Sequence, residues 1–154
     1  MNAGSFNDPP DSNGMAHFLE HMIFMGSEKY QREEEYGNHI SENGGFCNAF
    51  TNLEDTNFTF EISYSGLEKA LDMMSHNFYQ PLFDEDVIER EIQAIESEFK
   101  MNSGDDTVRM LQILQNTTTD PNHIFNRFMW GSLKSLYYKE KRETLKDDLR
   151  TFFD

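Results

Sequence analysis

The chain carries at residues 14–26 the stretch GMAHFLEHMIFMG, whose pattern predicts a helix with one buried face. Phe18, Met22 and Met25 recur at positions i, i+4 and i+7, which places their side chains on the same side of a helix. A helix that only filled a core would not need the two histidines and the glutamate that interrupt this stretch. Those polar residues therefore point to chemistry.

The residues that precede this helix, NDPPDSNG at 7–14, have the composition of turns. Ser12 or Asn13 is placed to cap the helix, and Gly26 is placed to end it. The helix thus has a defined start and end.

The rest of the chain predicts a short sheet accompanied by helices. The segment TNFTFEISY, residues 56–64, alternates apolar with polar residues, and this period of two is the clearest strand signal. Together with a strand predicted at 46–51, it indicates an antiparallel hairpin. Helical spacing predicts further helices at 30–43, at 66–80, from about 84, at about 105–116 and from about 143.

These elements indicate an α+β fold, an antiparallel sheet with helices packed on one face, as a single partial domain over residues 1–154. Two strands are too few for a sheet that is stable by itself. The chain also opens in a loop and closes within a predicted helix. We therefore expect a domain that is incomplete at both ends and that belongs to a longer protein or works with a partner subunit.

The composition excludes some classes of partner. With 28 acidic and 13 basic residues the net charge is −15, so the chain lacks the basic stripe that nucleic-acid binding requires. No apolar run is long enough to span a membrane. The single cysteine, Cys47, excludes an internal disulfide and favours a reducing, cytoplasmic location.

The pattern HFLEH, residues 17–21, indicates a metal site. His17 and His21 are four residues apart, so their imidazoles leave one helix face a turn apart and can reach one ion. Neutral imidazole suits zinc, and Glu20 beside the second histidine is placed to reach a bound water. This is H-x-x-E-H, the inverse of the commoner zinc-peptidase motif. The alternative is that both histidines are structural.

A catalytic zinc needs a third protein ligand. The helix predicted from about residue 84 offers many carboxylates: Glu85, Asp86, Glu89, Glu91, Glu96 and Glu98. Glu91 and Glu98 fall on one flank of its apolar stripe, and Glu89 and Glu96 fall on the other. Periodicity alone cannot choose between the flanks. The alternative for any one of these residues is a solvated position on an acidic helix.

Four stretches of the chain match a known family. They are SFNDPPDSNGMAHFLEHMIFMGSEKY (5–30), ENGGFCNAFTNLEDTNFTFEIS (42–63), ALDMM with Phe78 and PLFDEDVIEREIQAIESEF (within 70–99) and DPNHIFNRFMWGSLKSL (120–136). They resemble the insulysin and nardilysin group of the pitrilysin-type zinc peptidases. The stretches occur in the family's order and spacing between about residues 4 and 138, which is more specific than H-x-x-E-H alone.

The resemblance implies one Zn²⁺ per domain and a role for each residue that matches the family motif. His17 and His21 correspond to the two histidine ligands, and Glu98 corresponds to the third ligand. Glu20 corresponds to the catalytic base. Glu91 corresponds to the family's second carboxylate, which orients a ligating imidazole. The resemblance thus selects the flank that periodicity leaves open.

The resemblance also implies a peptide-binding edge. The strand at 46–51 corresponds to the edge against which these peptidases lay an extended substrate through main-chain hydrogen bonds. Asn48, Ala49 and Phe50 then contact the substrate, with Phe50 at the pocket beyond the scissile bond. The alternative for these residues is ordinary strand and core packing.

The expected function is therefore that of a zinc-dependent endopeptidase that cleaves peptides and small polypeptides. The competing hypothesis is a catalytically silent homologue that binds peptides or assembles with a partner. Silent relatives usually lose a ligand or the base, and all four positions are intact here, which favours the enzyme. The isolated chain is expected to bind zinc weakly and to be inactive, because an incomplete sheet positions the ligand helices poorly.

Overall fold

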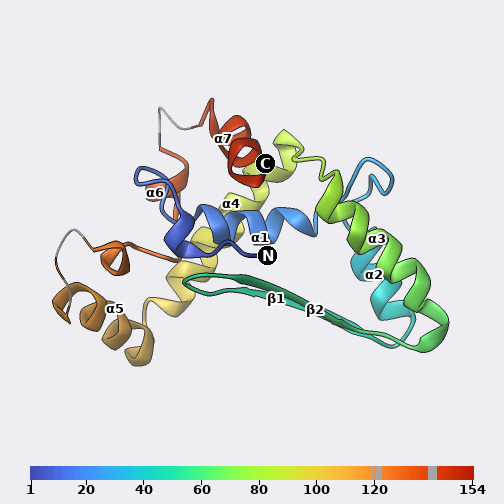
Figure 1. The fold of residues 1–154 in the computed structure, drawn as a ribbon, viewed down its shortest axis with the longest axis horizontal. Coiled ribbons are helices and arrows are strands. Elements are labelled where there is room, and N and C mark those ends of the chain that lie inside the picture. Colours follow the sequence, from blue (N-terminus) through green and yellow to red (C-terminus); the bar gives the residue numbers. More distant parts are fainter. Residues whose placement is uncertain (119, 121–122, 139–141) are drawn as a thin grey trace.

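The structure is a computed structural model that describes residues 1–118, 120, 123–138 and 142–154. Pro121 and Asn122, within the last of the four family-like stretches, lie outside the described residues. The fold is a mixed one in which helices accompany a two-stranded antiparallel sheet, as predicted. Helices α1 (Met15–Ile23) and α4 (Glu85–Asn102) lie on one side of the hairpin (Figure 1).

The remaining elements surround this centre. Helices α2 (Glu35–Glu42) and α3 (Leu67–Tyr79) flank one end of the hairpin, and α5 (Asp106–Thr118) lies beyond the other end (Figure 1). Helices α6 (Leu133–Leu136) and α7 (Leu145–Phe153) follow, and 3-10 turns occur at Ser5–Asn7, Tyr64–Gly66 and Ile124–Asn126. The segment 124–142, whose sequence shows no regular pattern, thus contains a short helix.

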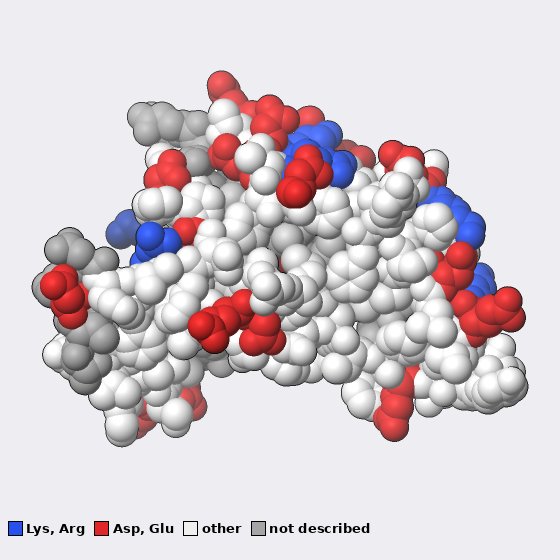
Figure 2. Space-filling model, viewed as in Figure 1, with Lys and Arg blue, Asp and Glu red and all other residues white. Residues whose placement is uncertain are grey.

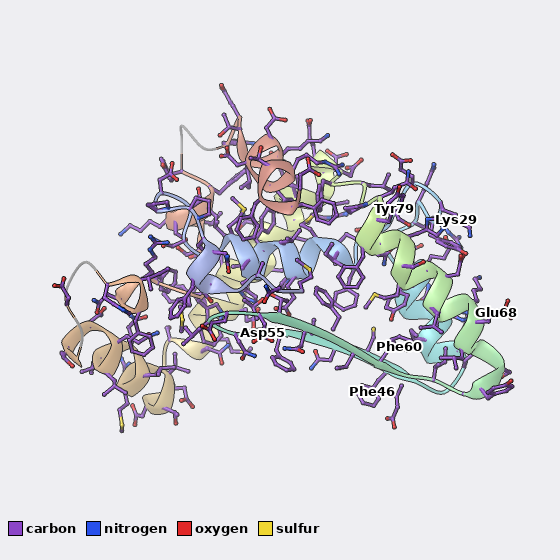
Figure 3. All side chains as sticks on the ribbon, in the orientation of Figure 1. Lys29, Phe46, Asp55, Phe60, Glu68 and Tyr79 are labelled. Carbon is purple, nitrogen blue, oxygen red and sulfur yellow. The ribbon has the colours of Figure 1, made fainter. Side chains whose placement is uncertain are left out.

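The hairpin consists of β1 (Phe46–Thr51) and β2 (Thr56–Glu61). Its register runs from the pair Phe46 and Glu61 to the pair Thr51 and Thr56. The predicted first strand is confirmed, whereas the second ends at Glu61 and not at residue 64, because a 3-10 turn begins at Tyr64. Among the described residues, the other edge of β1 has no strand partner. Asp55 marks the turn, and Phe46 lies at the opposite end (Figure 3).

The main core forms where α1 packs against α4 and α7. The predicted face is buried, with Phe18 and Met22 of α1 at most 1% exposed. The helix ends at Ile23 and not at Gly26 as predicted, and Met25 packs against the same cluster from just beyond the helix. The apolar stripe of α4 meets it through Ile92 and Ile95, both fully buried. Burial of each such side chain contributes about 1.5–3 kcal/mol. This packing fixes which flank of α4 faces α1.

The N-terminus of α1 is capped by a residue that lies closer to the start of the chain than the predicted cap. The Asp8 carboxylate accepts hydrogen bonds from the backbone N–H groups of Gly14 at 2.6 Å and Ala16 at 2.8 Å. Neither the Ser12 hydroxyl nor the Asn13 side-chain carbonyl oxygen makes such a bond, so the predicted cap at Ser12 or Asn13 is wrong. Turns between residues 9 and 14 fold Asp8 back onto the helix end. Burial raises the pKa of Asp8 to about 6, although the N–H donors and Arg127 oppose this rise.

The surface is acidic, as the composition predicts. Figure 2 shows acidic side chains spread over the visible face, with the few basic side chains mostly close to acidic ones. That face therefore presents no broad basic stripe for a phosphate backbone. Within the described ranges, no helix is both long and apolar enough to cross a bilayer.

Candidate metal centre

Three side chains from two helices converge at the centre of the fold. His17 and His21 project from α1, and Glu98 projects from α4. Glu98 Oε2 lies 3.6 Å from His17 Nε2 and 3.5 Å from His21 Nε2, and one ligand atom from each residue lies within 4.8 Å of the other two. Ligand atoms at the corners of a tetrahedral zinc site with 2.0–2.1 Å bonds lie about 3.4 Å apart. The spacing and the nitrogen and oxygen donors therefore fit a zinc ion.

Each imidazole is oriented by a hydrogen bond at its other ring nitrogen. His17 Nδ1 lies 2.6 Å from the backbone carbonyl oxygen of Trp130, and His21 Nδ1 lies 3.0 Å from Glu91 Oε2. Because these oxygens accept, each Nδ1 carries the proton and donates it. The lone pair is then on Nε2, the nitrogen that faces Glu98. This is how protein metal sites set the tautomer of a histidine ligand.

The charges around His21 affect its protonation. Burial lowers the pKa of this imidazole, but the hydrogen bond that it donates to Glu91 and the charges of Glu91 and Glu98 outweigh burial and raise the pKa overall. The metal-free site thus holds a proton more tightly than an exposed histidine does. Because a metal needs the neutral imidazole, metal binding at this site would release that proton and would weaken as the pH falls.

Glu20 lies on the same helix as the histidines and is only 8% exposed. Its Oε2 accepts a hydrogen bond from the Thr51 hydroxyl at 2.6 Å. Glu20, His17 and Glu98 line one side of a cavity of about 460 Å³. The opposite walls come from the end of β1 and its turn and from apolar side chains. These wall residues include Ala49, Phe50, Thr51, Leu53, Leu111, Phe125, Met129 and Trp130.

Most of the residues proposed from the sequence come together here. Ala49 and Phe50 line the cavity. Asn48, the residue before Ala49 in β1, does not line it. On α4, Glu91 and Glu98 face α1. The other flank contacts a different region: Glu89 binds Tyr137 and Arg142, and Glu96 accepts from the Leu133 N–H and pairs with Lys100.

Sequence reasoning missed three residues that shape this site. Trp130 acts through a backbone carbonyl, which leaves no side-chain signal. Asp8 lies in a turn-like segment in which Ser12 and Asn13, which are closer to the helix, are the predicted caps. Thr51 is a polar residue at the end of a strand, and its contact with Glu20 joins positions 31 residues apart.

The fold and this cluster together define an α+β domain whose candidate metal donors come from two helices. The chain belongs to the insulinase family, peptidase family M16, whose model matches residues 1–129. Its sequence is 46% identical over 136 residues to an Arabidopsis thaliana protein named nardilysin-like. It is 41% identical over 143 residues to the human insulin-degrading enzyme, and 40% identical over 154 residues to the A-factor-processing enzyme of Saccharomyces cerevisiae.

A solved structure shows the same fold. The crystal structure of pitrilysin matches 99% of this chain with a TM-score of 0.89 and 33% sequence identity. The three sequence matches above include 88%, 93% and 99% of this chain. It spans only 13%, 14% and 15% of the length of those relatives and 16% of the pitrilysin chain. The family is thus established for a region that makes up a small part of each relative.

Proposed function

We propose that this chain is the zinc-binding part of an endopeptidase that cleaves peptides and small polypeptides. The observation that carries this proposal is the convergence of His17, His21 and Glu98, with ligand atoms within 4.8 Å of one another, beside the buried carboxylate of Glu20. These three residues would hold the zinc. When bound, zinc would lower the pKa of a water toward ~7 and polarise the substrate carbonyl.

The protein's own residues have distinct tasks in this proposal. Glu20 takes the proton from the attacking water and returns it to the leaving amine, which is general base and then general acid catalysis. Glu91 and the Trp130 carbonyl hold the imidazoles of His21 and His17 in the ligating tautomer. Glu20 lines the cavity and is only 8% exposed, so little of its surface meets bulk water.

The open edge of β1 is the proposed substrate-binding element. An extended peptide would add to this edge through main-chain hydrogen bonds along Asn48, Ala49 and Phe50. Such binding tolerates many sequences, because the backbone carries it. Side-chain selectivity would come from the adjoining cavity, whose apolar wall suits an apolar residue next to the scissile bond.

Removal of the metal tests this proposal directly. In the longest expressed form that contains residues 1–154, we expect one zinc per domain and cleavage of a quenched peptide. A chelator should abolish cleavage, added Zn²⁺ should restore it, and Mg²⁺ should not, because it prefers oxygen ligands. Cleavage that survives complete zinc removal would refute the proposal. Stoichiometric zinc with no cleavage of any peptide would favour the silent homologue.

The close approach of two glycines near His17 gives a second prediction. Gly14 has φ +94°, and a Cβ added there would lie 2.2 Å from the Gly131 Cα. Gly14→Ala must therefore push away the segment that places the Trp130 carbonyl on His17 Nδ1. We expect zinc affinity to fall about 10- to 100-fold, the usual effect of losing a partner that orients a ligand.

Competition with a chromophoric chelator measures this loss of affinity. Gly104→Ala is the matched control, because a Cβ there meets nothing within 4 Å. The control should bind zinc as the wild type does. Equal zinc affinity in the two variants would show that the Trp130 carbonyl does not support the site.

A further inference from the structure

We propose that Thr51 is a positioning residue for Glu20, linking the substrate-binding strand to the catalytic base. This inference rests on the proposed function, because it concerns the residue that would carry the proton. Nothing in the H-x-x-E-H motif includes Thr51, which lies on β1 and not on α1.

The bond between Thr51 and Glu20 is short and charge-assisted. The hydroxyl Oγ1 lies 2.6 Å from Glu20 Oε2, within the 2.5–2.7 Å range of hydroxyl donors to carboxylates. Among the residues that the structure describes, Thr51 is the one that donates a hydrogen bond to Glu20. A glutamate side chain has several rotatable bonds, so one strong hydrogen bond at Oε2 holds its orientation and leaves Oε1 for the attacking water.

Thr51 packs against a second threonine, Thr56, across the hairpin. Thr51 and Thr56 form the last pair of the hairpin register, and their hydroxyl oxygens lie 3.1 Å apart. Thr56 is 1% exposed, and its hydroxyl also lies 2.9 Å from the Ala3 carbonyl oxygen. Each hydroxyl has a single proton: Thr51 donates its proton to Glu20, and Thr56 donates its proton to the Ala3 carbonyl oxygen. The approach of the two threonine oxygens is therefore a packing contact, and Thr56 is anchored by Ala3. The hairpin therefore determines where the Thr51 hydroxyl lies.

The position of Thr51 in β1 explains what this bond achieves. Ala49 and Phe50, the proposed substrate contacts, immediately precede it in the same strand. A peptide bound along β1 is thus placed relative to Thr51, and Thr51 places Glu20. A rigid link between the two matters, because a 1 Å misplacement of reacting groups can lower a rate by about 10²-fold.

Replacement of the hydroxyl by a methyl group tests the assignment. In the longest expressed zinc-loaded form, Thr51→Val should lower kcat about 10- to 100-fold, with KM and zinc content within about 2-fold of wild type. Thr51→Ser, which keeps the hydroxyl, should restore kcat to within about 3-fold of wild type. Thr144→Val is the matched control. It removes a hydroxyl that lies 3.0 Å from the Asp148 carboxylate, at the start of α7 and away from the cavity, and should leave kcat unchanged.

A double variant separates positioning from general damage. If Thr51 acts through Glu20, Thr51→Val should not lower the residual kcat of Glu20→Gln any further, whereas damage to the fold would add to it. Thr51→Ala serves in the same test if the valine variant fails to fold. A kcat for Thr51→Val within about 3-fold of wild type, or a loss that serine does not rescue, would overturn the assignment. Full activity in Glu20→Gln alone would instead refute the proposed function.

Discussion

Replacement of Glu20 by glutamine is expected to lower kcat for peptide cleavage by about 10²- to 10⁴-fold, the range that general acid–base catalysis supplies. Glutamine has the shape of glutamate and can accept the same hydrogen bond from Thr51, but it cannot take a proton. Glu20 is not one of the three residues whose ligand atoms cluster, so zinc content should stay at the wild-type level. Zinc analysis and a quenched-peptide assay of the same preparation measure both quantities.

The control for this variant is Glu68→Gln, which makes the same chemical change on an exposed part of α3, far from the centre of the fold (Figure 3). It should cleave as the wild type does. Loss of zinc together with activity in Glu20→Gln would place Glu20 among the ligands or in the fold of the site, and would contradict its role as the base.

Replacement of Glu98 by alanine is expected to remove the metal itself. With one of three protein ligands gone, His17 and His21 keep only two nitrogen donors, and a catalytic zinc site needs three. We expect zinc content to fall below about one tenth of stoichiometric and cleavage to fall with it. Glu91 raises the pKa of His21 most, and the charge of Glu98 adds to this rise. Because Glu98→Ala removes that added charge, the pH dependence of any residual binding should shift to lower pH.

Glu89→Ala is the matched control for this loss. Glu89 lies on the same helix and is a carboxylate of the opposite flank, where it pairs with Arg142 at 2.8 Å. An exposed ion pair of this kind contributes about 0–1 kcal/mol to stability, so the fold should survive. Stoichiometric zinc in Glu98→Ala, or equal loss of zinc in both variants, would show that the metal is not held by Glu98.

Local sequence patterns predict much of the secondary structure, because they depend only on residues that are close in the chain. The spacing of Phe18, Met22 and Met25 predicts one buried face, and all three side chains pack at the main core, although α1 ends at Ile23, before Met25. His17 and His21 lie one turn apart on any helix, so their shared face follows from the spacing alone. Segment ends were harder to predict. The strand predicted to reach residue 64 ends at Glu61, because a 3-10 turn competes with the last strand residues.

The sequence by itself determined the α+β class, the metal motif and, through its family resemblance, the names of the candidate ligands. Periodicity left open which flank of α4 faces the histidines, and only the resemblance selected one, since the choice depends on how α4 packs against α1. The tertiary structure places Glu91 and Glu98 beside His21. It also decided that Asp8 caps α1, that the Trp130 carbonyl orients His17 and that Thr51 holds Glu20. These bonds join residues between 6 and 113 positions apart, and no periodicity within one element can encode a distance between two.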